Sequence, residues 1–522
     1  MIDESFDSLV TYSDPLLSEY IRTPFSQLRS EKNHIEMSVT FKTSWLPAKL
    51  RTVLLFQVVI FITTFALYAA VHAVRKTIGN VKTPLEGIGY SGEFFGYMNS
   101  AFMLSYSIGM VFTGILGDKF RPTTVLMGAC IGVAVVTVAF GLLVTNFTSA
   151  GYWPLYVFMW VLSGLFQSCI WPVEVKLVSG WFGKSHSGAL FGIWSANSSV
   201  GNILGIGLSA LCIAIWGEGP VGLIWSFIMP TIVMMIVVVL VFFMPLNQQE
   251  AGFVTESDIK VDIETNTTTS IAATRANKPK VSIWVAWCLP GVIRYGLCYA
   301  CIKSVNYTIF YCLTSLLRDL GYQASVAYNI TILNDVGWIF GGLACGWGSD
   351  WMGYRAPFVG LFILLAVLPT ALIYPFVDST TVTAVLVTLN GFFAGGSGNV
   401  VASACCTDIG NSDALKKRKA KSTDDSSADD VSDDLIGQVS GIVDGIGAFG
   451  AAITQIVVSY LSKKYVAAVF YSLAGMLVVA FILICDLVYR ETSAWFRHGR
   501  NIKSAGDKQK QQIEIDSEQT VS

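Results

Sequence analysis

Long apolar runs separated by short polar stretches dominate this sequence. A helix that crosses a bilayer needs about 20 mostly apolar residues, and twelve runs of roughly that length can be marked along the chain. They lie at about 52–74, 94–116, 123–145, 152–174, 187–212, 221–244, 286–317, 325–348, 356–377, 380–408, 436–461 and 466–489. The pattern predicts an all-α membrane protein with 12 transmembrane helices.

A polar stretch at 246–283 divides these runs into two groups of six. The predicted organisation has a tail at 1–50, six-helix halves at 51–245 and 284–490, the linker between them, and a second tail at 491–522. Segment 411–434 carries a basic block followed by an acidic one and is too polar to pack, so we expect a disordered loop. It is either a solvated spacer or a regulatory, phosphorylated segment.

The composition agrees with a chain whose surroundings are mostly lipid. Of the 522 residues, 53% are hydrophobic and 13% are charged, whereas soluble proteins carry about 25% charged residues. The net charge of -2 provides no basic excess for binding nucleic acid. The sequence contains no recognisable nucleophile–base set, phosphate-binding loop or metal cluster. We therefore expect neither an enzyme nor a bound metal or cofactor. We also expect the protein to work as a monomer in the lipid bilayer.

Positive charge is concentrated in alternate loops, which sets the orientation of a membrane protein. These clusters comprise Lys42, Lys49 and Arg51; Lys119 and Arg121; Lys176 and Lys184; Lys260, Arg275, Lys278 and Lys280; Arg355; and Lys416, Lys417, Arg418, Lys419 and Lys421. The opposite loops hold fewer, with exceptions at Lys76, Lys82, Arg318, Lys463 and Lys464. Both termini are therefore predicted to be cytoplasmic.

A short motif occurs after the second run of each half. A glycine precedes Asp118 by four residues and Arg121 follows it; Asp350 and Arg355 repeat this arrangement in the second half. The glycines allow helices to approach closely, and the aspartate can cap a neighbouring helix and pair with the arginine in one conformation. The repeat resembles the GxxxD(R/K)xGR signature of the major facilitator superfamily. That resemblance implies two pseudo-symmetric six-helix halves and alternating access to a site between them.

Charged residues inside the apolar runs are candidate functional groups, because each costs roughly 2.5–3.5 kcal/mol to insert at a helix centre. The candidates are Arg75, Lys76, Arg294, Lys303, Asp335, Asp408 and Asp444. Glu174 lies near the end of a run and is expected at the membrane interface. Lys76 is expected to extend to the headgroups, and the same behaviour is the alternative for Arg75.

Two of these cations occupy equivalent helices of the two halves. Helical spacing places Tyr68, His72 and Arg75 on one face of the first span, and likewise Tyr299, Lys303 and Asn306 on one face of the seventh. Arg75 and Lys303 would therefore face a shared central cavity. A phosphate monoester carries about −1.5 to −2 charges at pH 7, so one cation from each half matches it. The predicted ligand is a small phosphorylated anion.

Several further motifs resemble the eukaryotic sugar-phosphate exchangers (solute carrier family 37), of the organophosphate:phosphate antiporter branch of that superfamily. They comprise Arg75-Lys76, Val81 to Leu85, Trp171-Pro172, Gly180 to Lys184, Gly192 to Trp194, Ser199 to Gly205, Pro290 to Val292, Lys303, Asp335 to Gly337, Ser349-Asp350 and Val443 to Gly447. The resemblance covers roughly residues 50–495. It implies exchange of a sugar phosphate for inorganic phosphate, with Arg75 and Lys303 as phosphate ligands. An endoplasmic reticulum or other endomembrane location is favoured over the plasma membrane.

One position departs from that family. Asn197 stands where the fifth helix of the family usually has histidine, which removes a titratable group from the expected substrate site. His72 is a spatial substitute in our interpretation. We expect the sugar part to contact Tyr68, Tyr299, Asn306 and Asn197.

These observations leave three hypotheses for the mechanism. In the first, Arg75 and Lys303 repel each other in the empty site by about 1.7 kcal/mol, at about 10 Å and an effective dielectric near 20; a bound phosphate removes this repulsion and favours exchange. In the second, the protein is a proton-coupled organic-anion symporter in which Asp335, Asp408 or Asp444 carries the proton. Asp444 is alternatively a structural or gating partner of a cation. In the third, the protein is a non-transporting sensor or scaffold that signals through 411–434.

Overall fold

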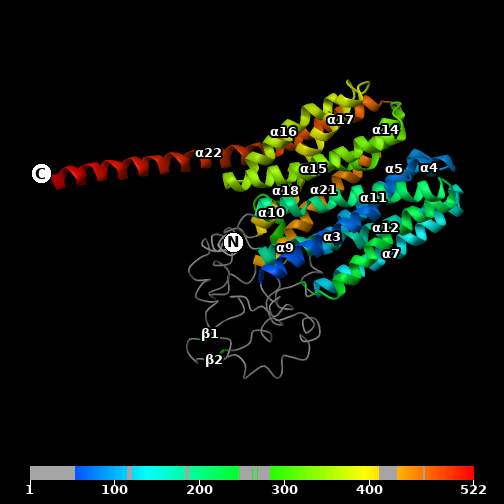
Figure 1. The fold of residues 1–522 in the computed structure, drawn as a ribbon, viewed down its shortest axis with the longest axis horizontal. Helices are drawn as coiled ribbons and strands as arrows, with labels where there is room; N and C mark the ends of the chain where they lie inside the picture. The colour runs from blue at the N-terminus through cyan, green and yellow to red at the C-terminus, as the bar shows by residue number, and fades with distance from the viewer. Residues whose placement is uncertain are drawn as a thin grey trace, which may run out of the picture.

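The computed structural model describes residues 53–113, 120–182, 187–244, 246, 261–262, 267–268, 283–410, 432–462 and 465–521. These residues form a bundle of long helices that run roughly side by side (Figure 1). The predicted tail at 1–50, Asp118, most of the linker at 246–283 and residues 411–431 of the predicted loop lie outside the described residues.

In the described residues, the first half contains six spans close to the predicted apolar runs. They are α3 (Val53–Asn80), α5 (Gly92–Thr113), α7 (Pro122–Asn146), α8 with α9 (Trp153–Ser168 and Ile170–Phe182), α10 with α11 (Ser187–Trp194 and Ala196–Trp216) and α12 (Pro220–Phe242). The short helix α4 (Lys82–Gly87) and the 3-10 turn η3 (Ala150–Tyr152) lie between spans. Pro122 and Pro220 occupy first-turn positions, where a missing N–H costs no intrahelical hydrogen bond.

The second half follows the same plan. It contains α13 (Ile283–Trp287), α14 (Val292–Asp319), α15 (Ala324–Met352), α16 (Ala356–Leu372), a segmented tenth span, α21 (Ser432–Leu461) and α22 (Val466–Val521). Gly291, at φ 98°, separates α13 from α14, so the seventh predicted run is two helices. Helix α22 continues through the predicted tail at 491–522 and extends beyond the bundle (Figure 1).

The tenth span is helical throughout but contains two π-helical segments. It comprises α17 (Thr380–Asn390), the π-helical η6 (Gly391–Gly395), α18 (Gly396–Val400), the π-helical η7 (Val401–Cys405) and α19 (Cys406–Gly410). In the linker, the two-residue strands β1 (Val261–Asp262) and β2 (Thr267–Thr268) pair antiparallel.

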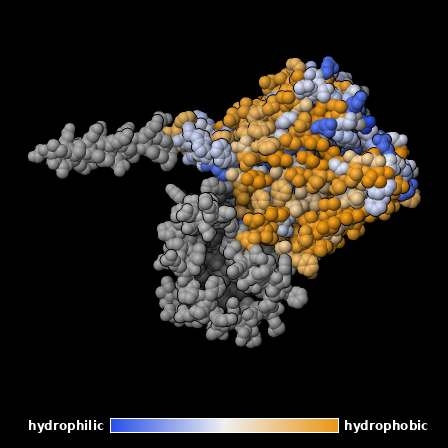
Figure 2. All heavy atoms as spheres, viewed as in Figure 1, coloured by the Kyte–Doolittle hydropathy of each residue, from blue (hydrophilic) through white to orange (hydrophobic). Residues whose placement is uncertain are grey.

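The outer surface of the bundle suits contact with lipid. Among the described residues, eight helical stretches are long and apolar enough to cross a membrane. The remaining spans are α5, α14, α15 and the 17-residue apolar α16. Large hydrophobic side chains are exposed on many helices, such as Phe112, Val135 and Leu368. Figure 2 shows one hydrophobic face of the bundle, with hydrophilic residues gathered mainly toward its right-hand end.

The two halves pack against each other reciprocally. The second span of the first half, α5, packs on the fifth span of the second half, α21; the second span of the second half, α15, packs on α10 and α11. A pseudo-twofold axis requires this exchange of partners. The α10–α15 contact is close: a Cβ on Gly192 would lie 2.5 Å from the Gly342 carbonyl oxygen, and one on Gly346 would lie 2.2 Å from that of Gly188.

Glycine is equally necessary where α15 meets η6 within the second half. A Cβ on Gly341 would lie 1.8 Å from the carbonyl oxygen of Phe392. We expect Gly341→Ala to destabilise the protein by about 1–3 kcal/mol, because backbone must move. Gly128→Ala is the matched control, because nothing lies within 4 Å of its Cβ position; it should be neutral or stabilise by about 0.5–1 kcal/mol. Thermal unfolding in detergent measures both, and equal stability of the two variants would contradict the assigned packing.

Candidate functional site

Arg75 lies deep between the two halves rather than at the headgroups. Its side chain is on α3 in a residue that is 3% exposed. Its Nε donates to Oε1 of Gln167 at 2.8 Å, and its Nη1 donates to the hydroxyl of Tyr307, on the other half, at 2.8 Å. The guanidinium carbon lies 5.2 and 4.9 Å from the ring centroids of Phe102 and Tyr106. Among the described residues, Nη2 has no hydrogen-bond partner, so it can donate to a ligand.

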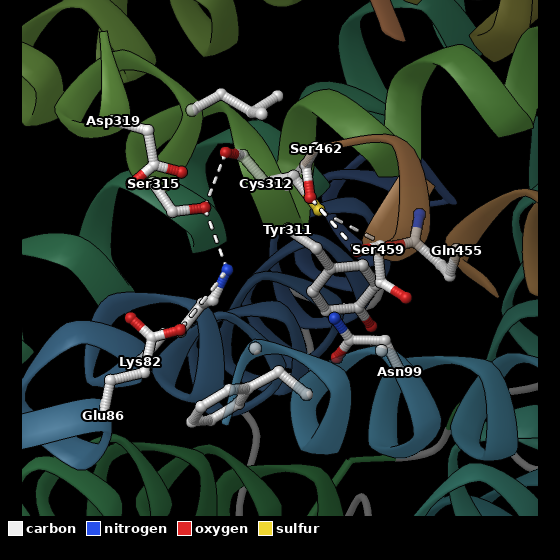
Figure 3. Close-up of a pocket in the computed structure, with 14 residues that line it drawn as sticks. Lys82, Glu86, Asn99, Tyr311, Cys312, Ser315, Asp319, Gln455, Ser459 and Ser462 are labelled. Carbon is white, nitrogen blue, oxygen red and sulfur yellow. Dashed lines mark hydrogen bonds and ion pairs between the residues drawn. The ribbon is translucent and has the colours of Figure 1, made fainter. Parts of the chain in front are cut away.

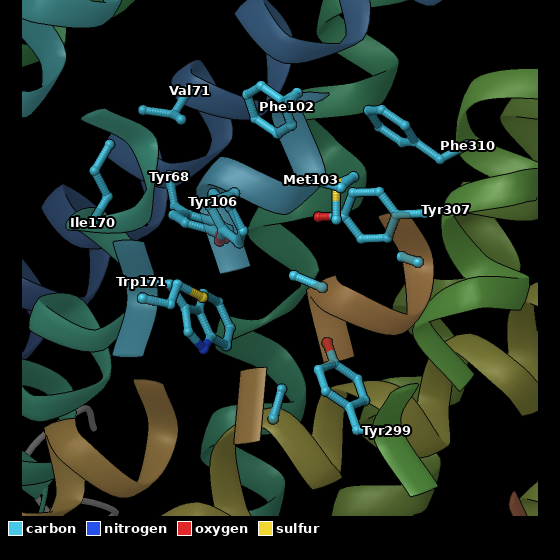
Figure 4. Packing of buried hydrophobic residues seen from close by; sticks show 14 of the residues in the cluster. Tyr68, Val71, Phe102, Met103, Tyr106, Ile170, Trp171, Tyr299, Tyr307 and Phe310 are labelled. Atoms are coloured by element: carbon cyan, nitrogen blue, oxygen red, sulfur yellow. The ribbon is translucent and has the colours of Figure 1, made fainter. Parts of the chain in front are cut away.

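Lys303 is buried at the facing position on α14, where the residue is 2% exposed. Its Nζ lies 2.7 Å from Oδ1 of Asp444 on α21, which compensates the buried charge. The same Nζ is 5.2, 5.3 and 5.4 Å from the ring centroids of Tyr106, Tyr299 and Tyr307. Figure 4 shows these rings among the packed aromatic residues between the halves.

The two cations therefore share one aromatic environment. The guanidinium carbon and the ammonium nitrogen lie 4.9 and 5.2 Å from the Tyr106 ring centroid, so they are at most about 10 Å apart. Asp444 changes the expected electrostatics of the empty site. At 2.7 Å and an effective dielectric near 20, its attraction to Lys303 is about 6 kcal/mol, larger than the expected repulsion between the two cations.

A chain of hydrogen bonds leads from Arg75 to the second half. Nε2 of His72 lies 3.5 Å from Nη1 of Arg75, and Nδ1 of His72 lies 3.1 Å from Oδ1 of Asn202. Nδ2 of Asn202 donates to Oδ1 of Asp335 on α15 at 2.8 Å. Because the Asn202 oxygen faces His72, Nδ1 carries the hydrogen and the lone pair of Nε2 faces Arg75. The chain links α3, α11 and α15 across the halves.

The other expected substrate contacts are distributed around this centre. The Tyr68 ring lies 4.8 and 4.9 Å from the rings of His72 and Trp171. Asn306 donates to the Ala394 carbonyl at 3.4 Å and so faces the tenth span. Asn197 is fully buried, and both polar atoms of its amide are unpaired among the described residues. The structure thus groups Tyr68 and His72 with Arg75, while Asn306 already contacts backbone.

Two expectations about charged residues are wrong. Lys76 is 2% exposed and donates to the Phe310 carbonyl at 2.5 Å, because α14 packs over the end of α3 and covers it. Glu174 is fully buried within α9 instead of lying at the interface, because α9 is covered by α21, α3 and α7. Arg294, by contrast, lies near the surface, where it pairs with Asp486 at 2.8 Å.

The motif of the second half forms a clasp between the halves. Asp350 accepts hydrogen bonds from the backbone N–H groups of Gly188 and Ala189, at 3.1 and 2.6 Å, in the first turn of α10. Arg355 pairs with Asp350 and also donates from Nε to Asp408 at 2.8 Å. The aspartate therefore caps a helix of the opposite half, as its position in the motif predicts.

The motif of the first half is described only in part. Arg121 is exposed and forms the N-cap of α7. Asp118 lies outside the described residues. The gating roles of these two residues therefore stay predictions.

Three side chains of this centre are not among the residues that the sequence predicts for the site. Tyr307 lies one turn beyond Lys303 on the same helix, so the spacing on α14 already contained the signal. Tyr106 and Gln167 lie on α5 and α8. Nothing in their local sequence indicates which helix faces them.

The helical arrangement and the family comparison lead to the same assignment. Residues 53–414 match the model of the family described as Major Facilitator Superfamily. The chain belongs to the Major Facilitator Superfamily. It is accordingly a multi-pass membrane protein of a family of transporters, with the fold that the repeated motif predicts.

Individual relatives agree with this membership. Sugar phosphate exchanger 3 of Homo sapiens is 32% identical over 481 residues, which cover 83% of this chain and 93% of that protein. Putative glycerol-3-phosphate transporter 2 of Arabidopsis thaliana is 30% identical over 468 residues, covering 84% and 88%. These similarities confirm the resemblance found in the sequence motifs.

Comparison with solved structures shows a similarity of fold. A proton:xylose symporter of the same superfamily superposes with a TM-score of 0.59 at 13% identity, covering 84% of this chain and 96% of that one. The Escherichia coli fucose:proton symporter gives 0.52 at 14% identity, covering 82% and 98%.

The Lys303–Asp444 pair generates a stability prediction. Asp444→Leu should destabilise the protein by about 3–5 kcal/mol, because it leaves a buried ammonium without its counter-ion. The double variant Lys303→Met, Asp444→Leu should recover most of this loss. Thermal unfolding in detergent tests both, with Asp486→Asn at the exposed pair as a control that costs at most about 1 kcal/mol. Additive losses in the double variant would show that the two charges do not compensate each other.

Proposed function

We propose that this protein exchanges an organic phosphate, such as a sugar phosphate, for inorganic phosphate by alternating access. The observation that carries the proposal is that each half contributes one buried cation to a single aromatic-lined centre. The relatives named as a sugar phosphate exchanger and a glycerol-3-phosphate transporter support this substrate class. We further propose that the protein is a monomer in an endomembrane with both termini in the cytoplasm.

Arg75 and Lys303 would hold the phosphate in different ways. The planar guanidinium can offer paired N–H groups to two phosphate oxygens, and its Nη2 is unpaired among the described residues. The ammonium is a point charge, and its Nζ lies 2.7 Å from Oδ1 of Asp444. Asp444 accepts one of the three N–H groups of this ammonium, so a phosphate at Lys303 would compete with Asp444 for its charge. This makes Asp444 an internal competitor for the substrate anion.

This competition favours exchange over leak. Lys303 pairs with Asp444 inside the second half, and the Arg75 guanidinium donates across to the neutral hydroxyl of Tyr307. A bound phosphate would instead join Arg75 to Lys303 and so draw the halves together. The loaded site then passes through the closed state more readily than the empty site, because only the loaded site gains this attraction.

Contacts at the two ends of the bundle would open in alternation. At the predicted non-cytoplasmic end, Lys82 donates to the Ser315 hydroxyl at 3.1 Å and Tyr328 donates to the Asn80 carbonyl at 3.0 Å. At the other end, the clasp of Asp350 on α10 joins the halves. We propose Asp118, Arg121, Asp350 and Arg355 as the cytoplasmic gating residues, and Asp444 as the switch between them and the site.

The Lys303–Asp444 pair also favours one alternative, proton-coupled symport of an organic anion. Protonation of Asp444 would release Lys303 without a competing anion. Uptake would then depend on a pH gradient and require no phosphate on the opposite side.

Substitution of the two cations tests the phosphate site. In counterflow into proteoliposomes loaded with inorganic phosphate, Lys303→Ala should abolish exchange, and Arg75→Lys should reduce it at least about tenfold because the fork geometry is lost. Arg294→Lys, at the peripheral pair with Asp486, is the control and should keep the wild-type rate. Unchanged phosphate exchange by Lys303→Ala would remove Lys303 from the mechanism.

A second experiment identifies the substrate and distinguishes phosphate exchange from proton coupling. Glucose 6-phosphate, glycerol 3-phosphate, phosphoenolpyruvate and triose phosphates are tested as competitors of labelled phosphate, with and without a pH gradient. We expect at least one to compete strongly, and exchange by the wild-type protein to proceed without a gradient. Uptake that needs the gradient, ignores internal phosphate and is lost in Asp444→Asn would establish the proton-coupled alternative instead.

A further inference from the structure

A cavity of about 200 Å³ lies between the halves at the predicted non-cytoplasmic end, outside the cation site. Helices α4 and α5 form its wall on the first half, and α14 and α21 form its wall on the second. It is smaller than the roughly 300–1,000 Å³ of pockets for drug-sized ligands. It therefore has room for a small polyol and not for a nucleotide.

Three residues that line this cavity (Figure 3) each carry one buried polar group without a protein partner among the described residues. These groups are Oδ1 of Asn99, the hydroxyl of Tyr311 and Nε2 of Gln455, in residues that are 7%, 4% and 1% exposed. None of the three atoms has a hydrogen-bond partner in the part of the chain that the structure describes. Such atoms are costly to bury unless a ligand or water satisfies them.

The chemistry of these groups matches hydroxyls better than phosphate. Oδ1 of Asn99 only accepts, Nε2 of Gln455 only donates, and the Tyr311 hydroxyl does both. A sugar hydroxyl also does both, so it can satisfy all three. A fully ionised phosphate only accepts and would leave Asn99 unpaired.

The charges around the cavity also make it a poorer site for phosphate than for neutral hydroxyls. The ammonium of Lys82 is already bonded to the Ser315 hydroxyl at 3.1 Å and lies 3.9 Å from the Glu86 carboxylate. Asp319 is a second lining carboxylate. With two carboxylates and one ammonium, this lining repels an anion while tolerating neutral hydroxyls.

Tyr311 lies between the cavity and the proposed phosphate site. The ring of Tyr311 lies 5.8 Å from that of Tyr307, whose hydroxyl accepts from Arg75. On α5, Asn99 lies two turns from Tyr106, which contacts both Arg75 and Lys303. The cavity therefore lies next to the cation site, toward the predicted non-cytoplasmic end.

We propose that this cavity is a subsite for the uncharged polyol part of an organic phosphate on its way to Arg75 and Lys303. The proposal rests on the function proposed above. The incoming molecule turns its phosphate toward Arg75 and leaves its hydroxyls among Asn99, Tyr311 and Gln455. Inorganic phosphate has no such part and makes no use of the subsite.

The test compares organic and inorganic phosphate in the same proteoliposomes. Gln455→Leu, Asn99→Leu and Tyr311→Phe each remove polar atoms with little change of volume. Each should raise the half-saturating external concentration of glucose 6-phosphate or glycerol 3-phosphate by roughly two- to tenfold, the value of one hydrogen bond. Self-exchange of inorganic phosphate should stay within about twofold of the wild-type rate, which also reports that the variants are folded.

The control is Tyr460→Phe, on the same helix as Gln455 but 69% exposed and outside the cavity lining. It should change neither activity. Equal effects of the cavity variants on both activities, or no effect on either, would show that the cavity holds only water or serves packing, and would overturn the subsite alone. A wild-type protein that exchanges neither kind of phosphate would overturn the proposed function together with the subsite.

Discussion

Positive charge buried in a bundle that faces lipid must be compensated from within the protein, and the two halves do this differently. Arg75 is surrounded by neutral groups: the oxygens of Gln167 and Tyr307 and two aromatic faces. Lys303 has a full counter-ion in Asp444. The first half therefore contributes a cation, Arg75, that contacts neutral groups. The second half contributes a cation, Lys303, that is paired with a carboxylate. An incoming anion completes the first environment and competes within the second.

The two halves pack against each other through close helix contacts and through hydrogen bonds at the ends of the bundle. The helices that carry the interface approach through glycine, as at Gly192 and Gly342, so their backbones are in contact with few side chains between them. The described contacts that join the ends include hydrogen bonds, such as those that the first turn of α10 donates to Asp350. Close backbone approach at small residues is typical of helix–helix interfaces in membranes.

The sequence predicts which side chains share a face of one helix, but it does not predict which side chains of different helices come into contact. Spacing correctly groups His72 with Arg75, and the glycine–aspartate motif correctly predicts that Asp350 caps a neighbouring helix. Lys76 was misjudged because its burial depends on α14, more than 200 residues away in the chain. The same limit explains why Tyr106 and Gln167 were missed. Periodicity identifies a face but does not name the helix that covers it.

The π-helical segment η7 determines the rotational phase of the end of the tenth span. Asn399 accepts from Trp338 and Asp408 accepts from Arg355, so both face the α15–α16 side. Nine positions apart, they would point in opposite directions on an uninterrupted α-helix, about 180° apart. A π turn absorbs one extra residue and reduces that angle to about 80°. Conversion of η7 to α-helix would turn Asp408 away from Arg355. The π-helical turn therefore links the winding of the tenth span to the clasp between the halves.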